Sequence, residues 1–321
     1  MRFIDWFAGI GGFRKGMELA GHECVGFCEF DKYAVMSYTA MHLCTQKQLD
    51  YLATLPMRQR QKEILKEKYR NGEWYANDVR SVDARNIPDA DCWCFGFPCQ
   101  DISVAGKQLG FTGNRSSLFF RVMYLVGQLP EEKRPAYLFI ENVKNLLSIN
   151  GGWDFARLLA EMDRGGYDAE WQVLNSKDFG VPQNRERVFI IGFLRGKRTT
   201  TLLSEAGMGA EIVQREGVHD PQRTPIYIGV GKPMKKDFVG AIIANYKTVG
   251  RRERTYICEN NNLRFFAPKE CFRLQGWTDD YFEKAQLVNS DSQLYRQAGN
   301  GVTVNVIEQM AERMSMEESA E

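Results

Sequence analysis

The chain has 321 residues, of which 44% are hydrophobic and 26% are charged, and its formal net charge is +1. This length predicts two domains, and the composition is that of an ordinary globular protein with a sizeable core. No apolar run approaches the roughly 20 residues of a membrane span, and the residues after Met1 lack a signal-peptide pattern. We therefore expect a cytoplasmic protein that makes no membrane contact.

Eight cysteines in a chain without a secretory pattern predict reduced thiols rather than a disulfide framework. No metal site is expected. Cys92 and Cys94 are taken to face opposite sides of a predicted strand, and no second cysteine pair stands at a ligand-like spacing.

Basic residues concentrate in one segment of the chain. Residues 195–264 hold 13 Lys/Arg and 7 Asp/Glu, a balance of +6, which leaves 29 against 34, or −5, for the rest. Such a segment is typical of a surface that meets a polyanion, although a solvated loop region with a chance excess would look the same.

The first 29 residues predict a nucleotide-binding βαβ unit. A strand over residues 2–7 leads into a glycine turn, a helix to about residue 20 and a second strand that ends at Glu29. Glycines let the backbone approach a ligand, and an acid at the end of the second strand can bind ribose hydroxyls. The G-x-G-G pattern is not the dinucleotide signature, so a plain tight turn is the alternative.

Residues 31–43 are expected to be helical, and residues 45–75 then change in character. Two charged segments with apolar residues at helical spacing are separated by Pro56. We interpret residues 45–75 as a surface helical insertion with a solvated face.

A thiol follows the next predicted strand. The apolar run 91–95 indicates a buried parallel strand, and Pro98 stiffens the turn that carries Cys99 past its end. Ligands of open α/β sheets bind at such strand ends. A lone cysteine is otherwise most often a small buried hydrophobe.

The remaining elements continue an α/β pattern. Glu141 ends a strand that begins at Tyr137, on the same edge of the sheet as Glu29 and Cys99. Arg185 and Arg187 are expected to share one face of a strand-entering stretch, where they could bind an anion or form salt bridges with Glu186 or Glu141. Further predictions are helices over 117–129, 152–164, 268–275 and 305–316, strands over 170–174 and 188–194, and a turn over 297–302.

Eight segments, taken in order, resemble the DNA (cytosine-5)-methyltransferase family. They are residues 5–12, 29–31, 77–79, 96–100, 141–143, 183–187, 273–276 and 297–300. The resemblance implies an α/β fold with a doubly wound, mostly parallel, Rossmann-like sheet that binds S-adenosyl-L-methionine. Residues 1–194 and 265–321 would form the catalytic domain, and residues 195–264 a small, loop-rich target-recognition domain.

The resemblance also implies a reaction at a cytosine that is flipped out of double-stranded DNA. Cys99 would add to C6 of the base, which makes C5 nucleophilic toward the methyl group of the cofactor. Glu141 would hold the N3/N4 edge of the base, Arg187 would contact its O2, and Arg185 would contact a phosphate or Glu141.

Further roles carry over residue by residue. The implied cofactor contacts are Phe7, Gly9, Ile10, Gly11, Gly12, Glu29, Phe30, Asp78, Val79, Pro98, Leu118 and Asn300. The expected DNA contacts are Gln100, Ser103 and Arg115, in a glycine-containing loop to about residue 117 that would close on DNA, and Lys232, Lys235, Arg251 and Arg252 in the basic segment. We expect a monomer whose substrate is double-stranded DNA. The resemblance is compatible both with a companion restriction endonuclease and with an enzyme that acts without one.

Three other functions are less consistent with the sequence. A tRNA-directed branch of the same family shares the cofactor site and nucleophile, but its distinctive Cys-Phe-Thr stretch is absent here. A catalytically idle DNA-binding module would not need Cys99, Glu141, Arg185 and Arg187 together. A nicotinamide oxidoreductase is disfavoured by the G-x-G-G turn.

Overall fold

The computed structural model describes residues 1–98, 118–196, 226–228, 234–236, 238–244, 255–259 and 262–318. Among these residues, none of the helices combines the length and the apolar character that crossing a membrane requires.

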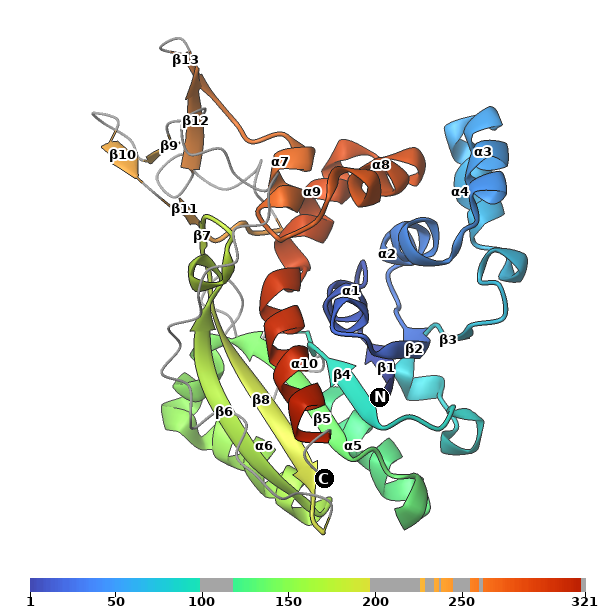
Figure 1. Ribbon diagram of the computed structural model, residues 1–321, viewed down its shortest axis with the longest axis vertical. Coiled ribbons are helices and arrows are strands. Elements are labelled where there is room, and N and C mark those ends of the chain that lie inside the picture. Colours follow the sequence, from blue (N-terminus) through green and yellow to red (C-terminus); the bar gives the residue numbers. More distant parts are fainter. Residues whose placement is uncertain are drawn as a thin grey trace.

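A seven-stranded sheet of order β3-β2-β1-β4-β5-β8-β6 forms the centre of the molecule (Figure 1). The first five strands in this order run parallel, β8 pairs antiparallel with β5, and β6 pairs antiparallel with β8, so that β8 alone is reversed among these seven strands. The strands are β1 (Arg2–Trp6), β2 (Glu23–Cys28), β3 (Trp74–Ala76), β4 (Cys92–Phe95), β5 (Tyr137–Val143), β6 (Tyr167–Asn175) and β8 (Glu186–Leu194). The mostly parallel sheet confirms the predicted fold class.

Helices cover both faces of this sheet, as side-chain alternation along its strands requires. One apolar core joins Ile4, Trp93 and Ile140 to α5 (Leu118–Gln128) and α6 (Trp153–Arg164). The other joins Phe3 and Phe139 to α1 (Gly12–Leu19) and α10 (Val304–Glu318). Because consecutive residues of β1 face different cores, the sheet is doubly wound.

Cys92 and Cys94 lie on the same face of β4, in the core under α1 and α10. Their Sγ atoms are 3.7 Å apart. The expectation that they face opposite ways was wrong, because residues two apart on a strand share a face. No cluster of three or more metal-ligating side chains occurs within the described part of the chain.

The insertion is a packing element rather than a solvated face. Its helices α3 (Gln46–Thr54) and α4 (Met57–Ile64) bury Leu52 and Ile64 in a cluster that also contains Val288 of α8 (Asp279–Val288). Arg60 donates to Leu52 O at 2.8 Å and to Leu287 O at 2.6 Å, and it therefore caps the ends of α3 and α8 together.

The segment before the last helix contains two helices that the sequence pattern did not predict. They are α8 and α9 (Asp291–Asn300), and they follow the predicted α7 (Pro268–Arg273). The expected turn at 297–302 is wrong in its first four residues, because Gln297 to Asn300 form the last turn of α9. Helix α2 (Lys32–Tyr38) continues into a π-helix over Thr39–Leu43.

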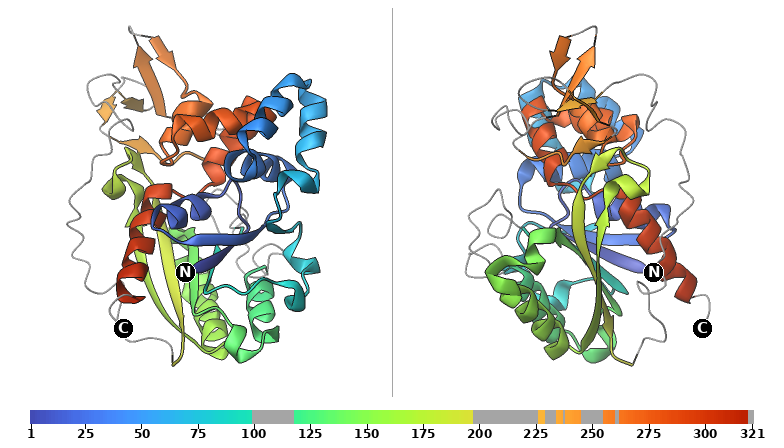
Figure 2. Two further views of the ribbon diagram at one scale, coloured as in Figure 1. Left: turned by 45° about the vertical axis from the view of Figure 1, so that its right-hand side comes forward. Right: turned by 90° about the vertical axis from the view of Figure 1, so that its left-hand side faces the viewer.

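A second sheet stands at the upper end of the large one in both views of Figure 2. It has the order β10-β9-β12-β13 with antiparallel pairs. Its strands are β9 (Ile226–Ile228), β10 (Met234–Lys236), β12 (Thr255–Glu259) and β13 (Asn262–Arg264). Two short strands, β7 (Gln183–Asn184) and β11 (Val239–Gly240), pair in parallel between the two sheets.

Candidate active site

The carboxyl ends of four parallel strands bring the predicted site residues to one edge of the sheet. Phe7 follows β1, Glu29 follows β2, Asp78 follows β3, and the segment Gly96–Pro98 follows β4. Because parallel strands end on the same side, these residues share one edge, as in other open α/β sheets.

The Glu29 carboxyl group joins the glycine turn to the start of α2. Its Oε2 accepts a hydrogen bond from Gly9 N at 2.8 Å, and its Oε1 accepts one from Asp31 N at 2.7 Å. Burial raises the pKa of Glu29, and the backbone hydrogen bonds oppose that shift. Each carboxyl oxygen has a second lone pair, so Glu29 can still accept hydrogen bonds from a ligand hydroxyl.

Two aromatic residues, Phe7 after β1 and Phe30 after Glu29, lie at the same edge of the sheet. Phe7 has a φ of 54°, which is uncommon for a non-glycine residue and frequent at functional sites. Phe30 is 66% exposed, and the Arg80 guanidinium carbon lies 5.9 Å from its ring centroid. Arg80 also forms an ion pair with Asp78 at 2.6 Å, so Asp78 already has a partner at this edge.

His42 contacts the backbone of the glycine turn, and no sequence motif predicted this role. Its Nε2 lies 2.9 Å from Ile10 O, and because a carbonyl only accepts, Nε2 carries the proton. A Cβ atom on Gly11, whose φ is +83°, would lie 2.4 Å from this nitrogen. The ring is carried by the π-helix, a feature often found at functional sites, but its sequence shows only ordinary helical spacing.

We predict that His42 makes the protein less stable in acid. Burial lowers the pKa of His42 well below its usual value, so the unfolded chain binds a proton that the folded protein does not as pH falls below about 6.5. The His42→Gln variant lacks this effect. Its stability deficit against wild type, measured by urea unfolding, should shrink by about 1 kcal/mol between pH 7.5 and pH 5.5; a constant deficit would contradict the prediction.

Glu141 lies inside β5 rather than beyond its end, because β5 pairs with β8 through Val143. Its Oε1 is 3.1 Å from Arg187 Nε. A Cβ atom built on Gly96 would lie 3.2 Å from the other carboxyl oxygen. The neighbouring Asn142 donates to Phe97 O at 3.2 Å. Thus β5 holds the carboxyl group against the backbone that leads to Cys99.

The electrostatic setting of Glu141 favours a proton on its carboxyl group. Burial raises its pKa above the usual value, and the charges of Arg187 and then Arg185 partly oppose this shift. A buried acid of this kind can donate a hydrogen bond or a proton near neutral pH.

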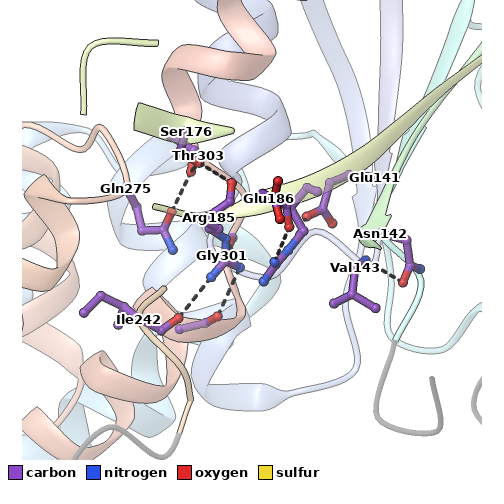
Figure 3. A network of polar contacts seen from close by, with 12 residues as sticks. Glu141, Asn142, Val143, Ser176, Arg185, Glu186, Ile242, Gln275, Gly301 and Thr303 are labelled. Atoms are coloured by element: carbon purple, nitrogen blue, oxygen red, sulfur yellow. Dashed lines mark hydrogen bonds and ion pairs between the residues drawn. The ribbon is translucent and has the colours of Figure 1, made fainter. Parts of the chain in front are cut away.

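Arg185 and Arg187 bind different partners, and Figure 3 shows those of Arg185. Arg185 is buried and donates to the carbonyl oxygens of Ile242 at 3.0 Å and Gly301 at 2.9 Å. Of the partners expected for this pair, Glu141 is bound by Arg187 as an ion pair. The charges of both arginines lower the pKa of Glu141, and their sharing of one face stays a prediction.

The other predicted site residues are placed as follows. Val79 is buried at the start of a 3₁₀ turn, Pro98 and Leu118 are partly buried, and Asn300 is exposed at the end of α9. Cys99, Gln100, Ser103, Arg115, Lys232, Arg251 and Arg252 lie outside the described residues, as does the loop over 100–117, and Lys235 is described only as backbone of β10.

The sequence matches a family model, C-5 cytosine-specific DNA methylase, over residues 1–56, 45–224 and 214–316. It is 30% identical to Type II methyltransferase M2.ScrFI of Lactococcus lactis subsp. cremoris, over 97% of this chain and 98% of that protein. It is 32% identical to M.NlaX of Neisseria lactamica, over 99% and 97%, and 30% identical to M.HhaI of Haemophilus parahaemolyticus, over 97% and 93%.

Solved structures with the same fold include other methyltransferases. The S. pombe Dnmt2 methyltransferase superposes with a TM-score of 0.69 at 17% identity, over 98% of this chain and 99% of that one. The Entamoeba histolytica methyltransferase EhMeth gives 0.66 at 16% identity, over 100% and 99%. At such low identity these similarities establish the fold alone.

Proposed function

Since this chain belongs to the C-5 cytosine-specific DNA methylase family and is a DNA (cytosine-5)-methyltransferase that uses S-adenosyl-L-methionine, we propose that it methylates a flipped-out cytosine through a covalent bond between Cys99 and C6. The observation that carries this proposal is the Glu141 carboxyl group, which Arg187 holds at 3.1 Å and which lies against Gly96, three residues before Cys99. A nucleophile and an acid that act on one pyrimidine ring must converge in this way.

The edge of the sheet suits the cofactor, which has an adenine ring, a ribose diol and an amino-acid part. The half-buried Glu29 carboxylate would accept hydrogen bonds from the diol, and Phe7 and the exposed Phe30 would contact the adenosine. Residues 9–12, with Asn300 opposite, would surround the amino-acid part. When bound, S-adenosyl-L-methionine supplies an electrophilic methyl group.

The protein's own groups would then perform the remaining steps. The Cys99 thiolate adds to C6, and the Glu141 carboxyl group donates a hydrogen bond or proton at N3 as negative charge develops on the ring. Arg187 would hold O2 of the base. After transfer, loss of the C5 proton and release of the Cys99 thiolate restore the aromatic ring.

Residues 195–264 are proposed to form the target-recognition domain, with residues 1–194 and 265–321 as the catalytic domain. Support comes from the separate sheet β10-β9-β12-β13 and the +6 charge balance of this segment. Phosphate contacts from its basic residues would supply affinity, and a few side chains would read base edges. The Type II relatives favour a short specific site, and a companion endonuclease, for this chain also.

Transfer of labelled methyl groups to candidate substrates tests the proposed function. Purified protein with methyl-labelled S-adenosyl-L-methionine should label double-stranded DNA at cytosine C5 and leave tRNA unlabelled. Label in tRNA alone would replace DNA by RNA as the substrate, and the absence of label in both would support an idle binding module.

We predict that Glu29→Gln weakens cofactor binding by roughly 10- to 100-fold, because hydrogen bonds to a charged group contribute about 1.5–3 kcal/mol. Isothermal titration with S-adenosyl-L-homocysteine measures the change. The control is Glu23→Gln, at the exposed glutamate that begins β2, the strand that Glu29 follows. Equal affinity in the Glu29 variant and wild type would contradict the assignment of Glu29 to the ribose.

A further inference from the structure

One short segment, residues 238–244, connects the second sheet to the catalytic domain. It follows β10 and contains β11. Val239 and Ile242 are 0% and 1% exposed, and they pack in an apolar cluster with Phe272, Leu294 and Ala298 from α7 and α9. The segment therefore packs against the catalytic domain, although in sequence it lies within residues 195–264, the proposed target-recognition domain.

Side chains of the catalytic domain bind both backbone polar groups of Ile242. Gln183 Oε1 accepts from Ile242 N at 2.9 Å, and Arg185 Nη1 donates to Ile242 O at 3.0 Å. The Gln183 amide nitrogen also donates to Leu274 O at 2.7 Å, and β7 pairs with β11 beside it. Gln183 is fully buried, so each of its bonds forms away from water.

The same guanidinium joins this segment to the C-terminal end of α9. Arg185 Nη2 donates to Gly299 O at 3.3 Å and to Gly301 O at 2.9 Å (Figure 3). Helix and segment touch directly here, because a Cβ atom on Gly299 would lie 2.2 Å from Ala244 N and from Ile243 C. Three chain segments thus meet at one buried arginine.

We propose that Gln183 and Arg185 are positioning residues for sequence recognition. They fix residues 238–244, and through them the sheet β10-β9-β12-β13, at a set position relative to α9 and Glu141. This inference rests on the proposed function of that sheet as the target-recognition domain. If these contacts are weakened, the target-recognition domain would still bind DNA. Its base-reading side chains would, however, be positioned less accurately relative to the active site.

The contact geometry requires arginine rather than a simple positive charge. The planar guanidinium donates in several directions at once, whereas a lysine ammonium is a point charge at the end of a flexible chain. Arg185→Lys therefore loosens the contacts with Ile242, Gly299 and Gly301 but keeps the charge that lowers the pKa of Glu141. The substitution therefore changes the geometry of these contacts more than the charge near Glu141.

The first test compares kcat/KM on the cognate duplex, identified with the wild-type enzyme, and on a duplex with one changed base pair in the site. In Arg185→Lys the cognate preference should fall roughly tenfold or more, since several hydrogen bonds to a charged donor are weakened. The measured quantity is the ratio of the two kcat/KM values, which is unaffected by any change in the absolute rate that both duplexes share. An unchanged preference would overturn the proposal, and Arg164→Lys, at an exposed ion pair with Glu161, is the matched control.

Gly299→Ala tests the same contact from the other side, because its methyl group must displace Ile243 and Ala244. Hydrogen exchange of the full chain with S-adenosyl-L-homocysteine needs no DNA. Both variants should exchange faster than wild type at Val239 and Ile242, with α5 unchanged. If both variants exchanged at the wild-type rate, the proposal would be overturned. If the wild-type enzyme methylated no DNA, that result would reject the proposed function but would not affect this exchange test.

Discussion

Cys99→Ser should abolish methyl transfer while the protein still binds its specific DNA. The thiolate supplies the bond to C6 that makes C5 nucleophilic, and a serine hydroxyl near neutral pH is a far weaker nucleophile. Loss of a nucleophile of this kind lowers the rate by roughly 10⁴-fold or more. The residual rate should be measured by methyl incorporation, and DNA affinity by a filter-binding or gel-shift titration.

A trapping experiment examines the bond itself. In a duplex with 5-fluorocytosine at the target, the C5 position holds fluorine instead of a proton, so the final elimination cannot occur and the adduct persists. Wild type and the matched variant Cys44→Ser, at a partly buried thiol beside the insertion, should form this adduct, and Cys99→Ser should not. An adduct in Cys99→Ser, or near-normal turnover, would assign the nucleophile elsewhere.

Glu141→Gln is expected to lower the single-turnover rate by about 10²- to 10⁴-fold, the range typical of general acid–base catalysis. The amide preserves the shape of the carboxyl group but cannot transfer a proton at N3. Affinity for S-adenosyl-L-homocysteine should be unchanged. Glu186→Gln, at an exposed residue of β8 that pairs with Lys144, is the matched control, and a Glu141→Gln rate equal to it would exclude a proton-transfer role.

The pH dependence follows from the direction of the pKa shift. Burial raises the pKa of Glu141, so its protonated form persists to higher pH than that of an ordinary glutamate. Above that pKa the active form is lost, and the single-turnover rate of wild type should fall as pH rises. Arg187→Ala removes the charge that most strongly opposes the shift, so its alkaline limb should move to higher pH even though its overall rate is lower.

Sequence patterns predicted the strands at the centre of the sheet well. Short apolar runs such as residues 91–95 and the glycine turn after β1 have strong local signals, and both lie where expected. Glu29 and Glu141 were also placed on the correct edge, because the carboxyl ends of parallel strands coincide.

Contacts between distant segments could not be predicted in the same way. Arg185 was expected to bind an anion or an acidic side chain, but it donates to the backbone carbonyl groups of Ile242 and Gly301, which are 57 and 116 residues away in sequence. His42 supports Ile10 from a π-helix, and Arg60 caps a helix that follows it by more than 200 residues. These side chains satisfy backbone groups whose position depends on the tertiary fold, which no local pattern reveals.

Bisulfite sequencing of a plasmid from a methylation-deficient host that expresses this protein tests the central claim most directly. Wild type should protect cytosines that recur within one short motif, and Cys99→Ala should protect none. Protection by wild type that persists in Cys99→Ala would contradict the covalent mechanism, and the absence of protected cytosines with either protein would contradict the assignment of DNA as the substrate.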